Sequence, residues 1–459
     1  MYIINFEKPI HIHFIGIGGI SMSGLAEILM EKGFIISGSD VKENNLPRRL
    51  ADLGAHIIYG QSATNIIDNI DVVVYSAAIH PDNPEFTCAV EKGLPMLTRA
   101  QLLGQIMKNY QISIAVSGSH GKTTTTSMAS HILLEAGYDP TISVGGILPS
   151  IGGNIRIGQS KTFITEACEY TDSFLSLSPK ISLILNIDAD HLDFFKNIEN
   201  IRYSFRKFSE LLPNDGTLII NADTPCYETI SNELSCQVIT YSLNSEADFT
   251  SYGIEYNEFG HPSFITLCHG ESIGKFSLHI PGIHNVSNAL AAIALASRLG
   301  ITPKLIQKGF SSFYGTNRRF QYKGKVGDVT VIDDYAHHPT EIKATLNAAR
   351  NYPHKTIWCV FQPHTYTRTK ALLPEFVEAL TLADKVILTN IYAAREKNTI
   401  GITSADLQSK IQEAGTECYY FPIFATIENF LLKNCSPGDL LITMGAGDVV
   451  KIGETLLGK

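Results

Sequence analysis

The sequence predicts an α/β protein made of three domains that are built on mainly parallel sheets. The chain has 459 residues, which is more than one ordinary hydrophobic core holds at roughly 150 residues per domain. Short apolar runs alternate with helical patterns over most of the chain, and two glycine-rich turns each link such a run to a helical pattern. We expect domains over residues 1–108, 109–320 and 321–459.

The first hundred residues show the alternation of a parallel sheet. Apolar runs (HIHFI, FIIS, DVVVY) are separated by helical stretches such as MSGLAEILMEKG, in which Met22, Leu25, Ile28 and Leu29 share one face. This pattern predicts successive βαβ units, because parallel strands need a crossover helix between them.

The rest of the chain predicts two further α/β domains and a small antiparallel sheet. In the second domain the strand-like runs ISIAV, TFITE and SLILNID each end in polar residues, and NVSNALAAIALASRLG closes it as a helix. Between about 237 and 280, short alternating runs such as FITLCHGESIGKFSLHI predict antiparallel strands. From about 324, the runs VTVID, TIWCVF, KVILTN and DLLITM alternate with helices again.

Composition narrows the class of function. The formal charge of −9 provides no general basic surface, so we expect no nucleic-acid partner and favour small-molecule pockets. Eight scattered cysteines with no C-x-x-C spacing argue against a zinc ribbon or a dithiol redox centre. The chain has no run of 18 apolar residues, and its N-terminus lacks a basic segment followed by an apolar run. We therefore expect a cytoplasmic protein with no membrane partner.

The segment SGSHGKTTTTS resembles a phosphate-binding loop that lacks one glycine. The usual G-x-x-x-x-G-K-[ST] spacing would put its first glycine at Val116. The segment still follows a strand and opens a helix, and it supplies a lysine (Lys122) and a hydroxyl (Thr123) to phosphate and Mg²⁺. An ordinary glycine-rich turn is the alternative. The residues predicted to cradle the phosphates are Gly118, Ser119, His120, Gly121, Lys122, Thr123 and Thr124.

Two neighbouring strand ends offer groups that could ligate a metal. TFITEACEY places Glu166 and Glu169 after one strand, and NIDADHLDF places His191 after another. Ligands bind at the carboxyl edge of parallel sheets, so these groups together predict a metal site. Taken singly, each is equally well explained as a solvated cap or a hydrogen-bonded core histidine.

The N-terminal segment HFIGIGGISMSG predicts a second site for a phosphorylated ligand. It follows a strand and opens a helix, and Asp40 lies 22 residues after Gly18, as an acid that binds ribose would. The G-x-G-x-x-G frame that starts at Gly16 ends on Ser21, which weakens a dinucleotide interpretation. Two phosphate sites suggest two nucleotides.

These motifs together resemble the Mur ligase family over nearly the whole chain. HFIGIGGISMSGLAEIL, the short GSHGKTTTT loop, NIDADHLD, PGIHNVSNALAA and NRRFQ are similar to family motifs, and the short loop accounts for Val116. DDYAHHPTEI, FQPHTYTRT, IYAAREK and MGAGD are typical of the family's alanine-adding member. The resemblance implies a Rossmann-like UDP-sugar domain, a central ATP-binding P-loop domain and a Rossmann-like amino-acid domain.

The resemblance also implies a reaction and roles for single residues. The lactate carboxylate of UDP-N-acetylmuramate would attack the γ-phosphate of ATP, and L-alanine would open the acyl phosphate, releasing ADP and phosphate. Lys122 would neutralise phosphate charge, and Thr123, Glu166 and His191 would hold Mg²⁺, with Glu169 as the alternative carboxylate. The nucleotide of ATP would contact His284, Asn285, Arg319, Asp334 and Tyr335. The UDP-sugar would contact Gly16, Gly18, Gly19, Ile20, Ser21, Asp40 and Ser76. Alanine would contact His337, His364 and Arg368.

Three departures from the family pattern concern this chain specifically. Ser21 stands where glycine is usual, which is tolerable if its φ is negative. Thr365 replaces an arginine close to the expected substrate end, and EACEYTD replaces the more usual EADESD.

The remaining expectations concern motion, assembly and rival functions. A hinge is predicted near residues 315–324, because one site would be split between domains. We expect a monomer or weak homodimer. The rival functions are a recycling ligase that adds a murein tripeptide to the same sugar, a nucleotide-regulated ATPase or binding protein, and a nicotinamide-dependent oxidoreductase.

Overall fold

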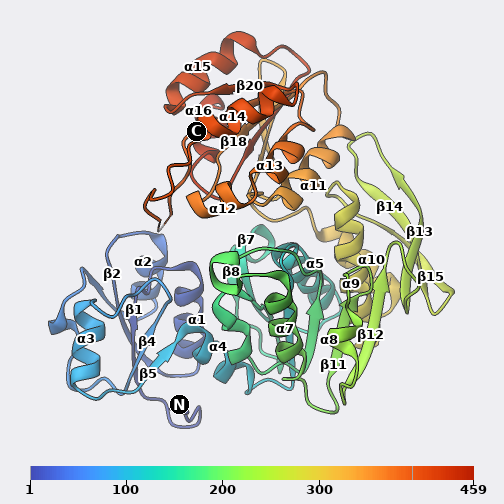
Figure 1. The fold of residues 1–459 in the computed structure, drawn as a ribbon. Helices are drawn as coiled ribbons and strands as arrows, with labels where there is room; N and C mark the ends of the chain where they lie inside the picture. The colour runs from blue at the N-terminus through green and yellow to red at the C-terminus, as the bar shows by residue number, and fades with distance from the viewer. Residues whose placement is uncertain (1, 395) are drawn as a thin grey trace. The chain divides into compact units, whose positions relative to one another are not determined.

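The structure is a computed structural model that describes residues 2–394 and 396–459, and it contains two compact units (Figure 1). The first unit comprises residues up to 126 together with 133–240. The second comprises residues 127–132 together with 241–459.

The first unit begins with a five-stranded parallel sheet of order β3-β2-β1-β4-β5. The order reverses between β1 and β4, and ligands of such sheets bind at the carboxyl ends of the strands at this point. Helices follow the strands as the apolar spacing predicts. The strands are β1 (His11–Ile15), β2 (Ile35–Asp40), β3 (His56–Tyr59), β4 (Val72–Tyr75) and β5 (Met96–Thr98), and the helices are α1 (Ile20–Glu31), α2 (Asn45–Asp52), α3 (Pro84–Glu91) and α4 (Arg99–Met107).

A second sheet of this unit carries the phosphate-loop motif. Its strands run parallel in the order β11-β10-β6-β9-β7, and β8 adds an antiparallel edge. The loop leaves the central strand β6 and enters α5 (Lys122–Glu135). The elements are β6 (Ile112–Ser117), β7 (Thr141–Leu148), β8 (Gly153–Arg156), β9 (Thr162–Glu166), β10 (Ile181–Ile184), β11 (Thr217–Asn221), the 3₁₀ segment η3 (Tyr170–Ser176), α6 (Leu192–Phe195), α7 (Ile198–Ser209) and α8 (Glu228–Ser231).

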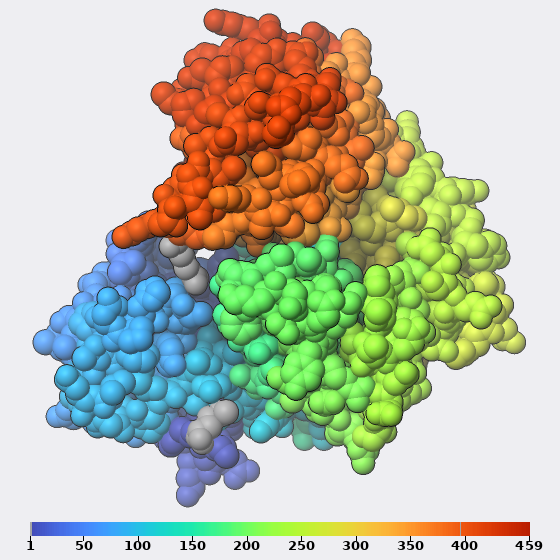
Figure 2. Space-filling view, viewed as in Figure 1, coloured from blue at the N-terminus to red at the C-terminus, as the bar shows by residue number. Residues whose placement is uncertain are grey.

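One hydrophobic core joins the two sheets of the first unit. It includes Phe14 of β1, Ile106 of α4 and Phe163 of β9, all fully buried. Gly104 permits the close approach of α4 to η3, because a Cβ at this position would lie 1.9 Å from the Ser176 carbonyl oxygen. In the space-filling view, residues of the first sheet and its helices (blue) border residues near 150–200 (green) (Figure 2), and α1 contacts β7 and β8. Helix α1 thus packs against β7 and β8, and α4 packs against η3.

The second unit contains a small sheet, two helices and a six-stranded sheet. Strands β13 (Phe249–Tyr256), β14 (Pro262–Cys268) and β15 (Glu271–Ser277) are antiparallel, as expected for the 237–280 segment, whereas β12 (Gln237–Ser242) pairs with β13 in parallel. Helices α9 (Ile283–Arg298) and α10 (Pro303–Ser312) follow. All residues from 288 to 296 of α9 are buried, which explains the continuous apolar run in NALAAIALA.

The six-stranded sheet has the order β16-β17-β21-β18-β19-β20, and β16 is its antiparallel edge. Separate apolar clusters cover its two faces, one around Phe361 and one around Trp358. The strands are β16 (Gln321–Val326), β17 (Val329–Asp334), β18 (Ile357–Phe361), β19 (Lys385–Leu388), β20 (Glu417–Tyr420) and β21 (Leu440–Met444), and the helices are α11 (Pro339–Arg350), α12 (Tyr366–Ala371), α13 (Leu373–Leu380), α14 (Ser404–Glu413), α15 (Phe424–Asn434) and α16 (Val450–Leu456).

The predicted α/β fold class is confirmed. Within the described part of the chain, no helix combines the length and apolar character that crossing a bilayer requires.

Candidate active site

The phosphate-loop motif forms a tight turn between β6 and α5. Gly118 has φ +140° and Gly121 has φ +84°, which are conformations that other residues rarely adopt. A Cβ on Gly118 would also lie 3.0 Å from Cβ of Leu185. The turn therefore requires these two glycines, and the structure accommodates Val116 as a buried residue of the strand.

The loop is fastened by residues that follow the neighbouring strand β10. The Asn186 side chain accepts from the His120 N–H (2.8 Å) and donates to the His120 carbonyl (3.0 Å). The Ser119 hydroxyl accepts from the Asp188 N–H (2.9 Å), and the His120 ring lies 3.1 Å from the Asp188 carboxylate. The sequence analysis missed Asn186 and Asp188. Their signal was their position immediately after a strand that pairs in parallel with β6.

Lys122 folds back over the loop instead of extending away from it. Its Nζ donates to the carbonyls of Gly118 and Ser119 and pairs with Glu169 at 2.8 Å. Burial alone would lower the pKa of Lys122, but the charge of Glu169 beside it raises the pKa overall. The lysine is thus held protonated at the start of a helix, where an anion is also favoured by the helix dipole.

Glu166 and Glu169 have different surroundings. The Glu169 side chain is 2 % exposed and is paired with Lys122. Glu166 ends β9 and accepts from the Gly145 N–H at 2.5 Å through Oε1. Thr123 lies in the first turn of α5 and is buried.

His191 has an unusual backbone conformation. It lies immediately before α6 with φ +54°, and its ring stacks on Tyr170 at 4.4 Å between centroids. Its Nε2 lies 3.7 Å from the Asp190 carboxylate.

The N-terminal glycine turn lies at the carboxyl edge of the first sheet. The Gly18 N–H donates to the Asp40 carboxylate at 2.8 Å, which links the ends of β1 and β2. Gly16 has φ +81°, and a Cβ there would lie 3.9 Å from Oγ of Ser76. Gly19 precedes α1, and Ile20 is its first residue. The predicted UDP-sugar residues therefore gather around the ends of β1, β2 and β4.

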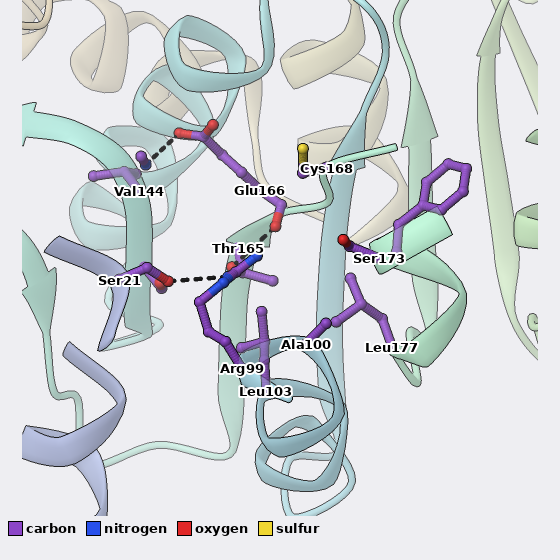
Figure 3. A pocket seen from close by; sticks show the side chains of 13 residues that line it. Ser21, Arg99, Ala100, Leu103, Val144, Thr165, Glu166, Cys168, Ser173 and Leu177 are labelled. Carbon is purple, nitrogen blue, oxygen red and sulfur yellow. Dashed lines mark hydrogen bonds between the residues drawn. The ribbon is translucent and has the colours of Figure 1, made fainter. Parts of the chain in front are cut away.

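Ser21 lies in the first turn of α1 and, as expected, is not among the residues with positive φ. Its hydroxyl accepts a hydrogen bond from Nη1 of Arg99 at 3.0 Å. The two residues line a cavity of about 210 Å³ together with Glu166 and Cys168 (Figure 3). The sequence analysis did not single out Arg99.

In the second unit, His284 and Asn285 begin α9. Asn285 donates to the Pro281 carbonyl (2.7 Å) and accepts from Asn288 (3.1 Å). Burial lowers the pKa of His284 to about 4, and the nearby charge of Arg319 acts in the same direction. His284 is therefore neutral near pH 7, as a group that hydrogen-bonds to an uncharged base should be.

Arg318 and Arg319 have different contacts. The Arg318 guanidinium bonds to Asp333 (3.0 Å) and to the carbonyls of Gly445 and Gly447, so Arg318 is not a free surface cation. Arg319 instead lies over the Tyr335 ring, 5.3 Å from its centroid, and 3.9 Å from Glu341.

Asp334 ends β17 and accepts from the N–H groups of Phe320 and Ala336, both at 2.7 Å. Burial raises its pKa to about 6, although the charge of Arg319 opposes the shift. The residue precedes Tyr335, so two of the predicted nucleotide contacts lie at the end of one strand.

The three residues predicted to bind alanine lie close together. The rings of His337 and His364 are 5.5 Å apart, and His364 Nδ1 lies 3.2 Å from Nη1 of Arg368. Thr365 lies between these two with φ +66°, and its N–H donates to the Tyr392 carbonyl. A β-branched residue rarely adopts this conformation, which makes the position strained.

Three family models match consecutive parts of the chain. The Mur ligase family catalytic domain matches residues 11–111, the Mur ligase middle domain matches 116–296, and the Mur ligase glutamate ligase domain matches 318–447.

Full-length relatives and solved structures agree with these matches. Proteins of Agathobacter rectalis and Lachnospira eligens, both named UDP-N-acetylmuramate--L-alanine ligase, are 59% and 58% identical to this chain, and each alignment covers 100% of both chains. The crystal structure of UDP-N-acetylmuramate-alanine ligase MurC from Thermotoga maritima has a TM-score of 0.82 at 28% identity, over 98% of each chain. A murein peptide ligase from Psychrobacter arcticus gives 0.71 at 25% identity, also over 98% of each chain. The chain therefore belongs to the Mur ligase family.

Proposed function

We propose that this protein is an ATP-dependent ligase that joins L-alanine to the lactate carboxylate of UDP-N-acetylmuramate. The observation that carries the proposal is the Lys122 loop within a chain that is similar over its full length to proteins named for this reaction. The product would be a precursor of peptidoglycan.

Lys122 has the main electrostatic role in this proposal. Its ammonium lies at the start of α5 and is held by two loop carbonyls, so it would meet the outer phosphates of ATP without reorganising the backbone. The carboxylate of the sugar would attack the γ-phosphate and displace ADP. The alanine amine would then attack the carbonyl carbon of the acyl phosphate, lose a proton and expel phosphate.

The donor set of this region fits Mg²⁺, a hard cation that prefers oxygen ligands and usually keeps several waters. The Thr123 hydroxyl and the Glu166 carboxylate would hold it, because Glu169 is already paired with Lys122. His191 is proposed as a further ligand. Bound Mg²⁺ would neutralise charge on the phosphates and on the incoming carboxylate.

The remaining assignments are also proposals. The glycine turn at the ends of β1, β2 and β4 would bind the UDP portion, and His284, Asn285, Arg319, Asp334 and Tyr335 would bind the nucleotide of ATP. His337, His364 and Arg368 would bind the alanine carboxylate. The three domains at 1–108, 109–320 and 321–459, the hinge at 315–324, a monomer or weak homodimer and a cytoplasmic location remain predictions. Small-angle scattering with and without ligands tests the hinge.

Coupled ADP release tests the reaction directly. We expect release that requires UDP-N-acetylmuramate and is fastest with L-alanine among the amino acids. ADP release that is equally fast without the sugar would refute a ligase and favour a nucleotide-regulated ATPase.

The similarity to a murein peptide ligase keeps a recycling ligase as the second candidate. Release only with the tripeptide, and not with free L-alanine, would favour that function.

A further inference from the structure

The cavity beside Glu166 contains a cation with an unusual environment. Arg99 is the first residue of α4, and its guanidinium lies between Ser21 and Thr165 (Figure 3). Its guanidinium donates a hydrogen bond to the Ser21 hydroxyl, which is an uncharged acceptor. Among the residues described, no carboxylate forms an ion pair with Arg99. Burial lowers the pKa of Arg99, but a guanidinium stays protonated in any protein.

This arrangement is unfavourable in the absence of a ligand. A cation in the first turn of a helix opposes the helix dipole, and partial burial removes solvation from the charge. Arg99 therefore opposes the helix dipole and loses solvation, and no carboxylate among the described residues compensates for these two costs by an ion pair. Departures of this kind are expected at sites that bind a ligand of opposite charge.

The neighbours of Arg99 indicate which anion the cavity receives. The cavity also includes Cys168, which directly precedes Glu169, the partner of Lys122. One end of the cavity thus lies next to the phosphate loop, where a carboxylate must arrive to be phosphorylated. Its volume of about 210 Å³ suits a fragment of a sugar nucleotide better than the whole molecule.

We propose that Arg99 binds the lactate carboxylate of the sugar nucleotide in this cavity and that the Ser21 hydroxyl positions Arg99. This inference rests on the proposed function. A guanidinium donates two parallel hydrogen bonds to a carboxylate, so it fixes orientation as well as charge. Ser21 accepts from one of the five N–H donors of Arg99, a residue that lines the cavity. Ser21 is therefore a positioning residue, and it stands where the family pattern has glycine.

The test compares two ligands that differ in the carboxylate. UDP-N-acetylmuramate carries the lactate group, whereas UDP-N-acetylglucosamine has the same diphosphate and lacks it. We expect Arg99→Gln to weaken binding of UDP-N-acetylmuramate about 10- to 100-fold by calorimetry, and to change binding of UDP-N-acetylglucosamine less than about 2-fold. Arg99→Lys, which keeps the charge, should fall between Arg99→Gln and the wild type. The control is Arg48→Lys, at an exposed ion pair.

Ser21 variants test its positioning role. Ser21→Ala should raise KM for UDP-N-acetylmuramate about 3- to 10-fold with little change in kcat, and Ser21→Thr should restore it, because the hydroxyl is retained. An equal loss for both sugar nucleotides in Arg99→Gln would overturn the inference in favour of a diphosphate contact or a structural role. Unchanged binding would overturn it outright. Wild-type protein that does not bind UDP-N-acetylmuramate would instead refute the proposed function.

Discussion

Lys122 and Arg99, two cations of the first unit, have different hydrogen-bond and ion-pair partners. Lys122 is enclosed by two carbonyls and the Glu169 carboxylate, whereas Arg99 has a hydroxyl and no ion pair among the described residues. A phosphate that binds Lys122 must therefore compete with an internal partner. An anion that binds Arg99 has no such competitor. The difference teaches that a charged site can be recognised by a missing partner as well as by a motif.

The largest effect is expected when the paired cation is removed. Lys122→Ala should lower kcat/KM for ATP about 10³-fold, because the buried charge that we propose to contact the phosphates is lost. Steady-state ADP release checks this, and circular dichroism confirms that the variant folds. Lys161→Ala, at an exposed lysine, is the matched control. Activity within 10-fold of wild type would contradict the role of Lys122.

Removal of the partner tests whether the pair stabilises the fold. Glu169→Gln leaves the buried ammonium without its counter-charge and should lower the free energy of unfolding by about 3 kcal/mol. Urea denaturation measures it, and a non-hydrolysable ATP analogue should recover more stability in the variant than in wild type. Glu199→Gln, at an exposed ion pair, should change stability by less than about 0.5 kcal/mol.

Asp334 extends the comparison to an acid of the second unit. Its folded-state pKa of about 6 exceeds the unfolded value, so the unfolded state loses its proton first as the pH rises. Relative to Asp334→Asn, the wild type should therefore lose stability between about pH 4 and pH 6, by a total of roughly 3 kcal/mol. Denaturation at a series of pH values measures this difference. A constant difference over this range would show that Asp334 ionises normally.

The smallest effect is expected when Arg99 is given a nearby carboxylate, as Lys122 has in Glu169. Cys168→Asp introduces a carboxylate whose charge acts on Arg99, so it should raise KM for UDP-N-acetylmuramate about 3-fold. Cys168→Ser keeps the site neutral and is the control. An unchanged KM in the Asp variant would indicate that Arg99 does not contact the substrate.

Much of the fold followed from the sequence, because the spacing of apolar residues and the two glycine turns are local signals. The loop was predictable since strand, glycines, lysine and hydroxyl are consecutive. The contacts that define the site could not be predicted from the sequence. The pairing of Lys122 with Glu169, and not with Glu166, depends on how the residues after β9 turn.

Arg99 was missed for the same reason. Its distance from Ser21 is set by the packing of α4 against α1, two helices that are far apart in the sequence. No pattern in the sequence reports such an approach. Arg318 could not be separated from Arg319 either, because their difference lies in which loop carbonyls surround each guanidinium.

Oxygen transfer from the sugar carboxylate tests the central claim most directly. UDP-N-acetylmuramate labelled with ¹⁸O in the lactate carboxylate would be converted with ATP and L-alanine, and the released phosphate would be analysed by mass spectrometry. Attack of the carboxylate on the γ-phosphate predicts one ¹⁸O atom in each phosphate released. Phosphate that carries no label from the sugar would contradict carboxylate activation and with it the proposed ligase reaction.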